Sequence, residues 1–217
     1  MSNYITKRDD TGFDKEFKTA GWEEYVDGFG KYNDRATKRS GNGAFWLGLE
    51  KLHKLTNSRP KEEGHWEVLI NIHFYVAEFD DKGYGYAVYD NFRVESEVFE
   101  YTLRLGKLKD QQGLNYTFNG NETPFKYILE QYRDKQFSTH DRDNGESGDK
   151  CGVVQKGGWW FNDYCKPFIK NIDEKDVKWD KTADRPWFCP NCHNVWAIDD
   201  NWGVTEVSMA VRFVNKK

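Results

Sequence analysis

The spacing of apolar residues predicts two short helices near the start of the chain. In residues 22–29 (WEEYVDGF) the apolar side chains follow i, i+3, i+4, i+7 spacing, which places them on one helix face. Residues 44–55 (AFWLGLEKLHKL) carry leucines at a similar interval, and the polar run ending in Pro60 stops this second helix. We therefore expect two amphipathic helices, each with one buried face.

Alternation of apolar and polar residues predicts strands further along the chain. The pattern has period two over residues 65–76, 85–94 and 98–105, with short turns between these segments. Consecutive strands joined by short turns favour an antiparallel sheet. Alternation returns at residues 204–213, a strand that we expect to join the same sheet.

Between these strands lies a long stretch without periodicity. Gly, Asn, Asp, Cys and Trp dominate from about residue 107 to about residue 200. Loop-rich stretches of this length inside compact domains are usually functional. We expect one domain over residues 1–217. In it, residues 1–106 and 203–217 form a central sheet subdomain, and residues 107–202 form a loop-rich subdomain.

Composition narrows the class of protein. The 217 residues suit a single domain, and 17% aromatic residues with nine Trp indicate an aromatic core. The net charge of −4, with Lys and Arg scattered among acids, argues against a nucleic-acid partner. Since no run of about 20 apolar residues occurs, no membrane span is expected. The polar start does not resemble a signal peptide, so we expect a fragment or mature form.

The four cysteines come as two close pairs, Cys151 with Cys165 and Cys189 with Cys192, which allows two disulfides. The sequons at Asn115 and Asn121 are candidate glycosylation sites and, with the paired cysteines, favour export. For Cys189 and Cys192 three interpretations stay open. They are a tight disulfide, reduced thiols in a cytosolic chain, or zinc ligands together with His193.

Four segments, in order, resemble the fibrinogen C-terminal domain family, which includes ficolin-like lectins. They are WEEYVDGFG (22–30) with FWLGLEKLHKLT (45–56), the strand ending YTLRL (101–105), FSTHDRDN (137–144) with Cys151 and GGWWFNDYC (157–165), and the ending Trp196…Met209…Arg212. The resemblance does not include the N-terminal segment that members of the family usually have. The resemblance implies an α+β fold with a central twisted antiparallel sheet, flanking short helices and a loop-rich ligand-binding subdomain.

The resemblance also implies a ligand pocket beside a Cys151–Cys165 bridge, with a cis peptide before Cys165. Aromatic rings there would stack on a sugar, although core packing is the alternative for at least one Trp. Lys166 follows Cys165 where many family members carry His, which favours an anionic or hydroxyl-rich ligand over an acetyl group. The candidate ligand-binding residues are Trp159, Trp160, Tyr164, Cys165, Lys166, Asn191 and His193.

The run from residue 141 to 149 is rich in oxygen donors, which suit Ca²⁺. A solvated acidic loop is the alternative. The resemblance implies calcium here, with ligands at Asp143, Gly145, Ser147 and Asp149. Gly145 stands where the family normally has an acid, so we expect a weakened site.

The function implied by the resemblance is that of a secreted, lectin-like protein of innate immunity that binds carbohydrate or acetyl groups. Weak binding per site would favour several copies, as in a homo-oligomer. The alternative is an extracellular protein ligand or adhesion domain that binds a receptor, as angiopoietin-like proteins do. No catalytic motif occurs, so no enzyme is expected, although the many carboxylates leave a glycosidase pair open.

Overall fold

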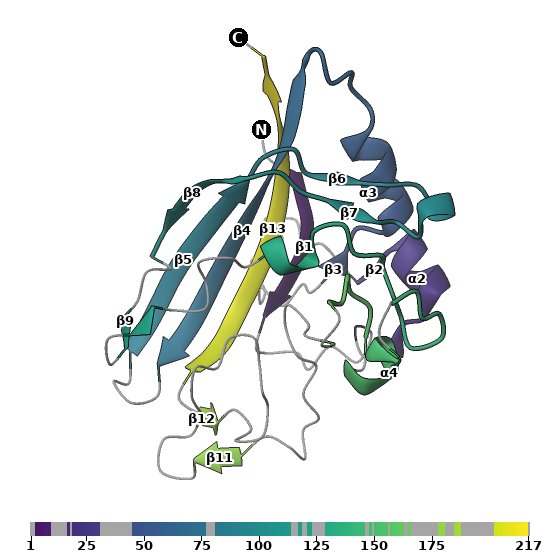
Figure 1. Cartoon of the computed structure of the whole chain (residues 1–217). Helices are drawn as coiled ribbons and strands as arrows, with labels where there is room; N and C mark the ends of the chain where they lie inside the picture. Colours follow the sequence, from purple (N-terminus) through teal and green to yellow (C-terminus); the bar gives the residue numbers. More distant parts are fainter. Residues whose placement is uncertain are drawn as a thin grey trace.

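The computed structural model describes residues 3–9, 17, 19–30, 45–76, 81–113, 117–118, 121–122, 129–145, 148, 150–155, 157–162, 165, 178–180, 185–187 and 202–216. Its main feature is a seven-stranded antiparallel sheet with the strand order β2-β3-β1-β13-β4-β5-β8 (Figure 1). The strands of this sheet are β1 (Asn3–Asp9), β2 (Phe29–Gly30), β3 (Phe45–Trp46), β4 (Gly64–Val76), β5 (Asp81–Tyr89), β8 (Leu108–Gln112) and β13 (Trp202–Asn215).

The two longest strands, β4 and β13, form the centre of the sheet. They pair from Trp202 opposite Val76 to Asn215 opposite Gly64, with one irregularity between Val204 and Glu206. Along β4 every second residue enters the core, since Val68, Ile70 and Ile72 have no exposed surface, whereas His73 is exposed. The alternation in the sequence therefore predicted both strands correctly, including the return of the last strand to the first sheet.

The two helices form where the apolar spacing predicts them, but both are shorter. The first, α2 (Trp22–Asp27), buries Trp22 and Tyr25, and Phe29 belongs to β2 instead. The second, α3 (Leu49–Thr56), begins five residues late. Phe45 and Trp46, which the pattern predicts as helix, form β3 instead, and Gly48, whose φ is +106°, turns the chain from strand into helix.

One aromatic-rich core joins the helices to the sheet. Rings from α2, from β3 and from the loop-rich part of the chain meet edge-on or tilted. Trp46 and Phe137 contact each other, and each of them also contacts Tyr25 and Trp160. The same core includes the inward side chains of β4 and β13. The high aromatic content of the sequence thus fills the space between the helices and one sheet face.

A short hairpin replaces most of the predicted third strand. Strand β6 (Arg93–Val94) pairs with β7 (Leu103–Arg104), and the 3₁₀ turn η2 (Glu97–Phe99) lies between them. The predicted strand over residues 98–105 is wrong for its first half. The reason is that Glu100 and Tyr101 adopt left-handed φ values of 51° and 47°, which no strand accommodates.

The remaining elements are short. They are β9 (Thr117–Phe118), β10 (Asn121–Glu122), η4 (Glu130–Tyr132), α4 (Cys151–Gln155), β11 (Lys178–Asp180) and β12 (Arg185–Trp187). Strand β8 pairs with β5, so the large sheet extends past residue 107, where we expected the loop-rich part to begin. The division into two subdomains stays a prediction. Within the described residues, no helix has the length and apolar character needed to cross a membrane.

Candidate functional site

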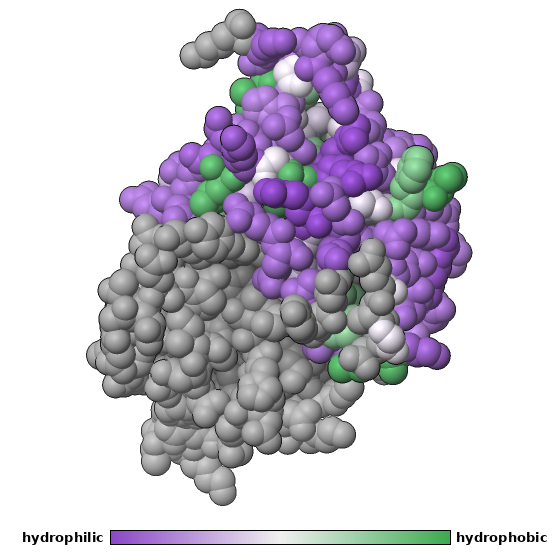
Figure 2. All heavy atoms as spheres, viewed as in Figure 1, coloured by the Kyte–Doolittle hydropathy of each residue, from purple (hydrophilic) through white to green (hydrophobic). Residues whose placement is uncertain are grey.

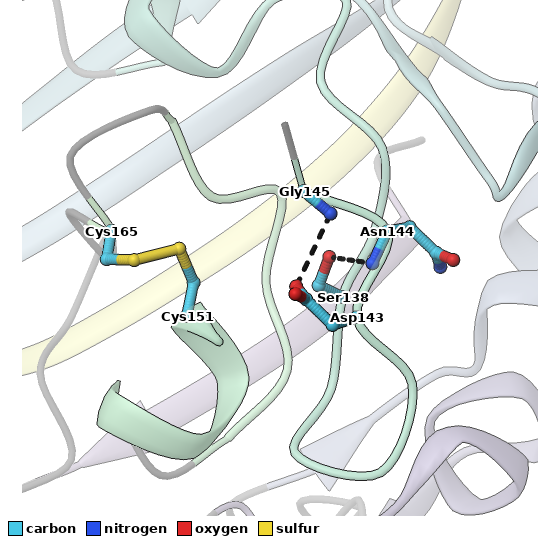
Figure 3. The surroundings of a disulfide bond; sticks show 6 residues. All are labelled: Ser138, Asp143, Asn144, Gly145, Cys151 and Cys165. Atoms are coloured by element: carbon cyan, nitrogen blue, oxygen red, sulfur yellow. Dashed lines mark hydrogen bonds between the residues drawn. A yellow bond between two sulfur atoms is a disulfide. The ribbon is translucent and has the colours of Figure 1, made fainter. Parts of the chain in front are cut away.

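A disulfide joins Cys151, the first residue of α4, to Cys165 (Figure 3). Both cysteines are buried, and they form a small apolar cluster with Phe161, against which Trp159 packs. The bridge therefore joins the two ends of the segment beside which the resemblance implies a ligand pocket.

Helix α4 lies unusually close to the neighbouring loop. A Cβ added to Gly152 would overlap the backbone carbonyl of Thr139, so only glycine permits this approach. The next two residues point outward, and Val153 and Val154 are 50% and 59% exposed. The disulfide region thus presents a pair of aliphatic side chains to solvent on a firmly packed helix.

The two tryptophans expected to contact a sugar differ in their surroundings. Trp160 is only 1% exposed, and its indole N–H donates to the carbonyl of Tyr101 at 2.7 Å. Trp159 is partly exposed, its ring lies edge-on to that of Tyr132, and its backbone exchanges two hydrogen bonds with Ser138. Since Trp160 lies in the core, it offers no ring face to a ligand. We therefore do not propose it as a ligand-binding residue.

The loop of residues 137–145 is anchored to the beginning of α2. Gly21, the residue before the helix, has no side chain to cap it. Asp141, 119 residues after Trp22, replaces that cap, because its carboxylate accepts the Trp22 N–H at 2.9 Å and the Thr139 hydroxyl at 2.6 Å. Partial burial alone would raise the pKa of Asp141, but the hydrogen bonds from Thr139 and Trp22 lower it overall.

We expect the replacement Asp141→Ala to lower the free energy of unfolding by about 1 kcal/mol at pH 7, because α2 loses its cap. Folding lowers this pKa, so the stabilisation is present above the unfolded pKa of about 3.9. It is lost as the pH falls through the lower pKa of the folded protein. Urea unfolding of both proteins between pH 7 and pH 3 measures the difference, which should shrink at acid pH.

A matched control for this experiment is Asp143→Ala. The Asp143 carboxylate is exposed and accepts a long hydrogen bond of 3.4 Å from Gly145, so the change should be below about 0.5 kcal/mol. If the effect of Asp141→Ala were as large at pH 3 as at pH 7, the ionised cap would not be its cause.

Arg142 links the same loop to the β6–β7 hairpin. Its guanidinium lies 3.9 Å from the centre of the Trp22 ring and forms ion pairs with Glu97 at 3.0 Å and Glu100 at 2.7 Å. The Trp22 indole N–H also donates to Glu97 at 3.0 Å. The loop, α2 and the turn of the hairpin are therefore held together as one unit.

The expected calcium ligands are described only in part. The Asp143 carboxylate turns back toward the Gly145 N–H, while Asn144 donates its N–H to the Ser138 hydroxyl (Figure 3). Ser147 and Asp149 lie outside the described residues. Among the described residues, no three His, Cys, Asp or Glu side chains gather as metal ligands do, and Asp143 alone does not make the oxygen set that Ca²⁺ takes. Calcium binding stays a prediction.

Most other expected site residues lie outside the described part of the chain. They are Tyr164, Lys166, Cys189, Asn191, Cys192, His193 and the sequon residue Asn115. The peptide before Cys165 involves Tyr164 and is therefore not described either. Asn121 begins β10. The second disulfide and both glycosylation sites stay predictions.

Sequence reasoning missed the residues that hold this region in place and those that face outward. Asp141 and Arg142 looked like members of an acidic run, because their partners are far away in the sequence. The predicted strand over residues 98–105 includes Val98 and Phe99, although two adjacent apolar residues break the alternation that a half-buried strand requires. That break was the available signal for an exposed apolar turn.

Curated relatives match about two thirds of the chain. Fibrinogen-like protein 1 of Bos taurus is 33% identical over 141 residues, which are 65% of this chain and 39% of the relative. Angiopoietin-related protein 2 of Homo sapiens is 32% identical over 141 residues, again 65% of this chain but 22% of the relative. The chain thus spans well under half the length of these relatives.

The fold is also found in solved structures. The fibrinogen-like globe domain of human ANGPTL2 has a TM-score of 0.60 and 25% identity, and the match covers 96% of this chain and 78% of that one. The family model described as "Fibrinogen beta and gamma chains, C-terminal globular domain" matches residues 4–208. This chain therefore belongs to the family of fibrinogen C-terminal globular domains.

Proposed function

We propose that this chain is an extracellular protein-binding domain that recognises a receptor or adhesion partner, with the face around the Cys151–Cys165 bridge as its binding surface. The observation that carries the proposal is that the side chains exposed beside the bridge are the aliphatic Val153 and Val154. Exposed apolar groups rimmed by polar residues are typical of protein contacts. Similarity to angiopoietin-related protein 2 supports the same class of function.

The lectin interpretation has less support. A sugar site depends on exposed aromatic rings that stack on the pyranose, but Trp160 is buried in the core and Trp159 packs against Tyr132. The protein-binding function is thus the stronger of the two, and it needs no catalytic group and no bound calcium.

Secretion is part of the proposal. A buried disulfide forms and persists in oxidising compartments and is rare in the cytosol. We therefore propose that the partner is also extracellular. Mass spectrometry of the natively produced protein would contradict secretion if it found Cys151 and Cys165 as free thiols.

A panel of purified extracellular receptor domains, probed with the immobilised chain, tests the function. We expect binding to one or a few members that persists after enzymatic removal of their N-glycans. The replacement Val153→Ser with Val154→Ser should weaken that binding about 10-fold, since it removes two aliphatic contacts, and should leave the melting temperature unchanged.

A glycan array probed with the same protein tests the lectin alternative. Binding to several related glycans, competed by free N-acetylglucosamine, together with no binding to any deglycosylated receptor domain, would overturn the proposal in favour of a lectin.

A further inference from the structure

The face of the large sheet that points away from the core carries a hollow with a volume of about 330 Å³. Its floor is a row of directly paired apolar residues, because Ala210 lies opposite Leu69 and Leu69 lies opposite Val88. We refer to this hollow, which crosses β13, β4, β5 and β8 (Figure 1), as the sheet trough. The described surface in Figure 2 is mostly hydrophilic, with small and separate hydrophobic patches, and an apolar row across several strands is unlike it.

Polar side chains form the walls of the trough on both sides of this floor. On one side the Glu67 carboxylate accepts two hydrogen bonds from the Arg212 guanidinium, at 2.9 and 2.8 Å, so these two charges balance each other. The residues on the other side are Asn71, Tyr84 and Tyr86. Asp110 of the edge strand β8, which lies opposite Val88, closes one end of the floor.

The hydrogen bonds of the two tyrosines leave acceptors, not donors, for a ligand. The Tyr84 hydroxyl donates to Asn71 Oδ1 at 2.9 Å. The Tyr86 hydroxyl donates to Asp110 Oδ2, also at 2.9 Å. This second hydrogen bond is the main cause that raises the pKa of the Tyr86 hydroxyl, which therefore keeps its proton at neutral pH. With both protons used, each hydroxyl offers a ligand only its oxygen lone pairs.

Asp110 differs from Glu67 because no cation balances its charge. Among the residues that the structure describes, no Lys, Arg or His forms an ion pair with Asp110, and only Tyr86 donates a hydrogen bond to it. Since Glu67 and Arg212 balance each other, the trough keeps the negative charge of Asp110. A ligand is therefore expected to bring a positive charge to the β8 end of the trough.

A guanidinium or ammonium group on an aliphatic stem matches these features together. Its N–H groups can donate to Asp110 and to the tyrosine oxygens, and the faces of tyrosine rings attract a positive charge. The methylene groups of the stem can cover the apolar floor while the charged head stays near water. The volume is close to the lower limit of about 300 Å³ for ligand pockets, which suits one side chain.

We propose that the sheet trough binds an arginine or lysine side chain of a protein partner, with the cation on Asp110 and the stem along Leu69 and Val88. The source of the side chain rests on the proposed protein-binding function. The contact itself lies on the large sheet and is separate from Val153 and Val154. It can therefore be tested without the partner.

The test is a titration of the ¹⁵N-labelled full chain with the peptide Ac-Gly-Arg-Gly-NH₂, followed by NMR. We expect saturable shifts of the backbone amides of Leu69, Val88 and Asp110, with a dissociation constant on the order of 1 mM for one exposed ion pair and a short stem. The same peptide with citrulline in place of arginine keeps the shape and loses the charge. It should bind about 5-fold more weakly or not at all.

Three variants locate the contact. Asp110→Asn keeps the shape of the trough and should weaken binding of the arginine peptide about 5-fold. Ala210→Leu fills the floor from β13 and should weaken binding by a similar factor, with melting curves confirming that the variant folds. Glu62→Gln removes one charge from an exposed residue before β4 and outside the trough, so it is the matched control and should bind as the wild type does.

The outcomes separate this proposal from the proposed function. Equal binding of the arginine and citrulline peptides, or unchanged binding by Asp110→Asn, would overturn the trough proposal and leave the protein-binding function standing. Shifts confined to residues around the Cys151–Cys165 bridge would also overturn it, as would shifts of the trough amides with N-acetylglucosamine but not with the arginine peptide. If the peptide binds in the trough while no receptor domain in the panel binds the chain, the proposed function fails and the cation site is kept.

Discussion

Replacing Trp160 with alanine is expected to lower the free energy of unfolding by about 3–5 kcal/mol, the range found when a buried Trp is removed from a core. The side chain is 1% exposed and contacts the rings of Trp46, Phe137 and Trp159. The replacement also leaves the Tyr101 carbonyl without the indole donor. Guanidinium unfolding followed by circular dichroism measures the change.

The control for this experiment is Val153→Ala, on the exposed side of α4, which should change stability by less than about 0.5 kcal/mol. A loss below about 1 kcal/mol for Trp160→Ala would mean that the ring is not in the core. Its assignment as a sugar-stacking residue would then be open again.

Removing the disulfide by Cys151→Ala with Cys165→Ala is expected to lower the free energy of unfolding by about 3 kcal/mol. The bridge joins residues 14 positions apart, and a loop of that size restricts the unfolded chain by about this amount. Thermal unfolding of the wild type and of the variant gives the difference.

Reduction provides the matching control. Treatment with a phosphine reductant should destabilise the wild type and should leave the double alanine variant, which has no such bridge, as stable as before. If the wild type were equally stable with and without reductant, while mass spectrometry showed the bridge to be broken, then the disulfide would not support this region.

Local patterns predicted the existence of both helices and the three longest strands of the large sheet, β4, β5 and β13, but not its short strands β2, β3 and β8. The period-two alternation that identified β4 is visible because Val68, Ile70 and Ile72 face the core while their neighbours do not. The helix boundaries were less accurate, because the apolar residues of β3 and α3 form one continuous run in the sequence. Only the φ of Gly48 divides that run into strand and helix.

The site was predictable where it depends on neighbouring residues and not where it depends on distant ones. The bridge between Cys151 and Cys165 could be expected from the resemblance. The cap that Asp141 provides for α2 could not, because nothing local relates residue 141 to residue 22. Burial of Trp160 depends in the same way on rings contributed from elsewhere in the chain.

The position of β13 in the sheet has a consequence for how the domain folds during synthesis. This strand pairs with β1 on one side and β4 on the other, and these two strands do not pair with each other. Among the strands of the sheet, the ribosome synthesises residues 202–215 last. Before they are made, the strands β2-β3-β1 and the strands β4-β5-β8 form two groups that no hydrogen-bonded strand connects. Until then the unpaired backbone edges of β1 and β4 stay open to pairing with other chains, which exposes the incomplete domain to aggregation.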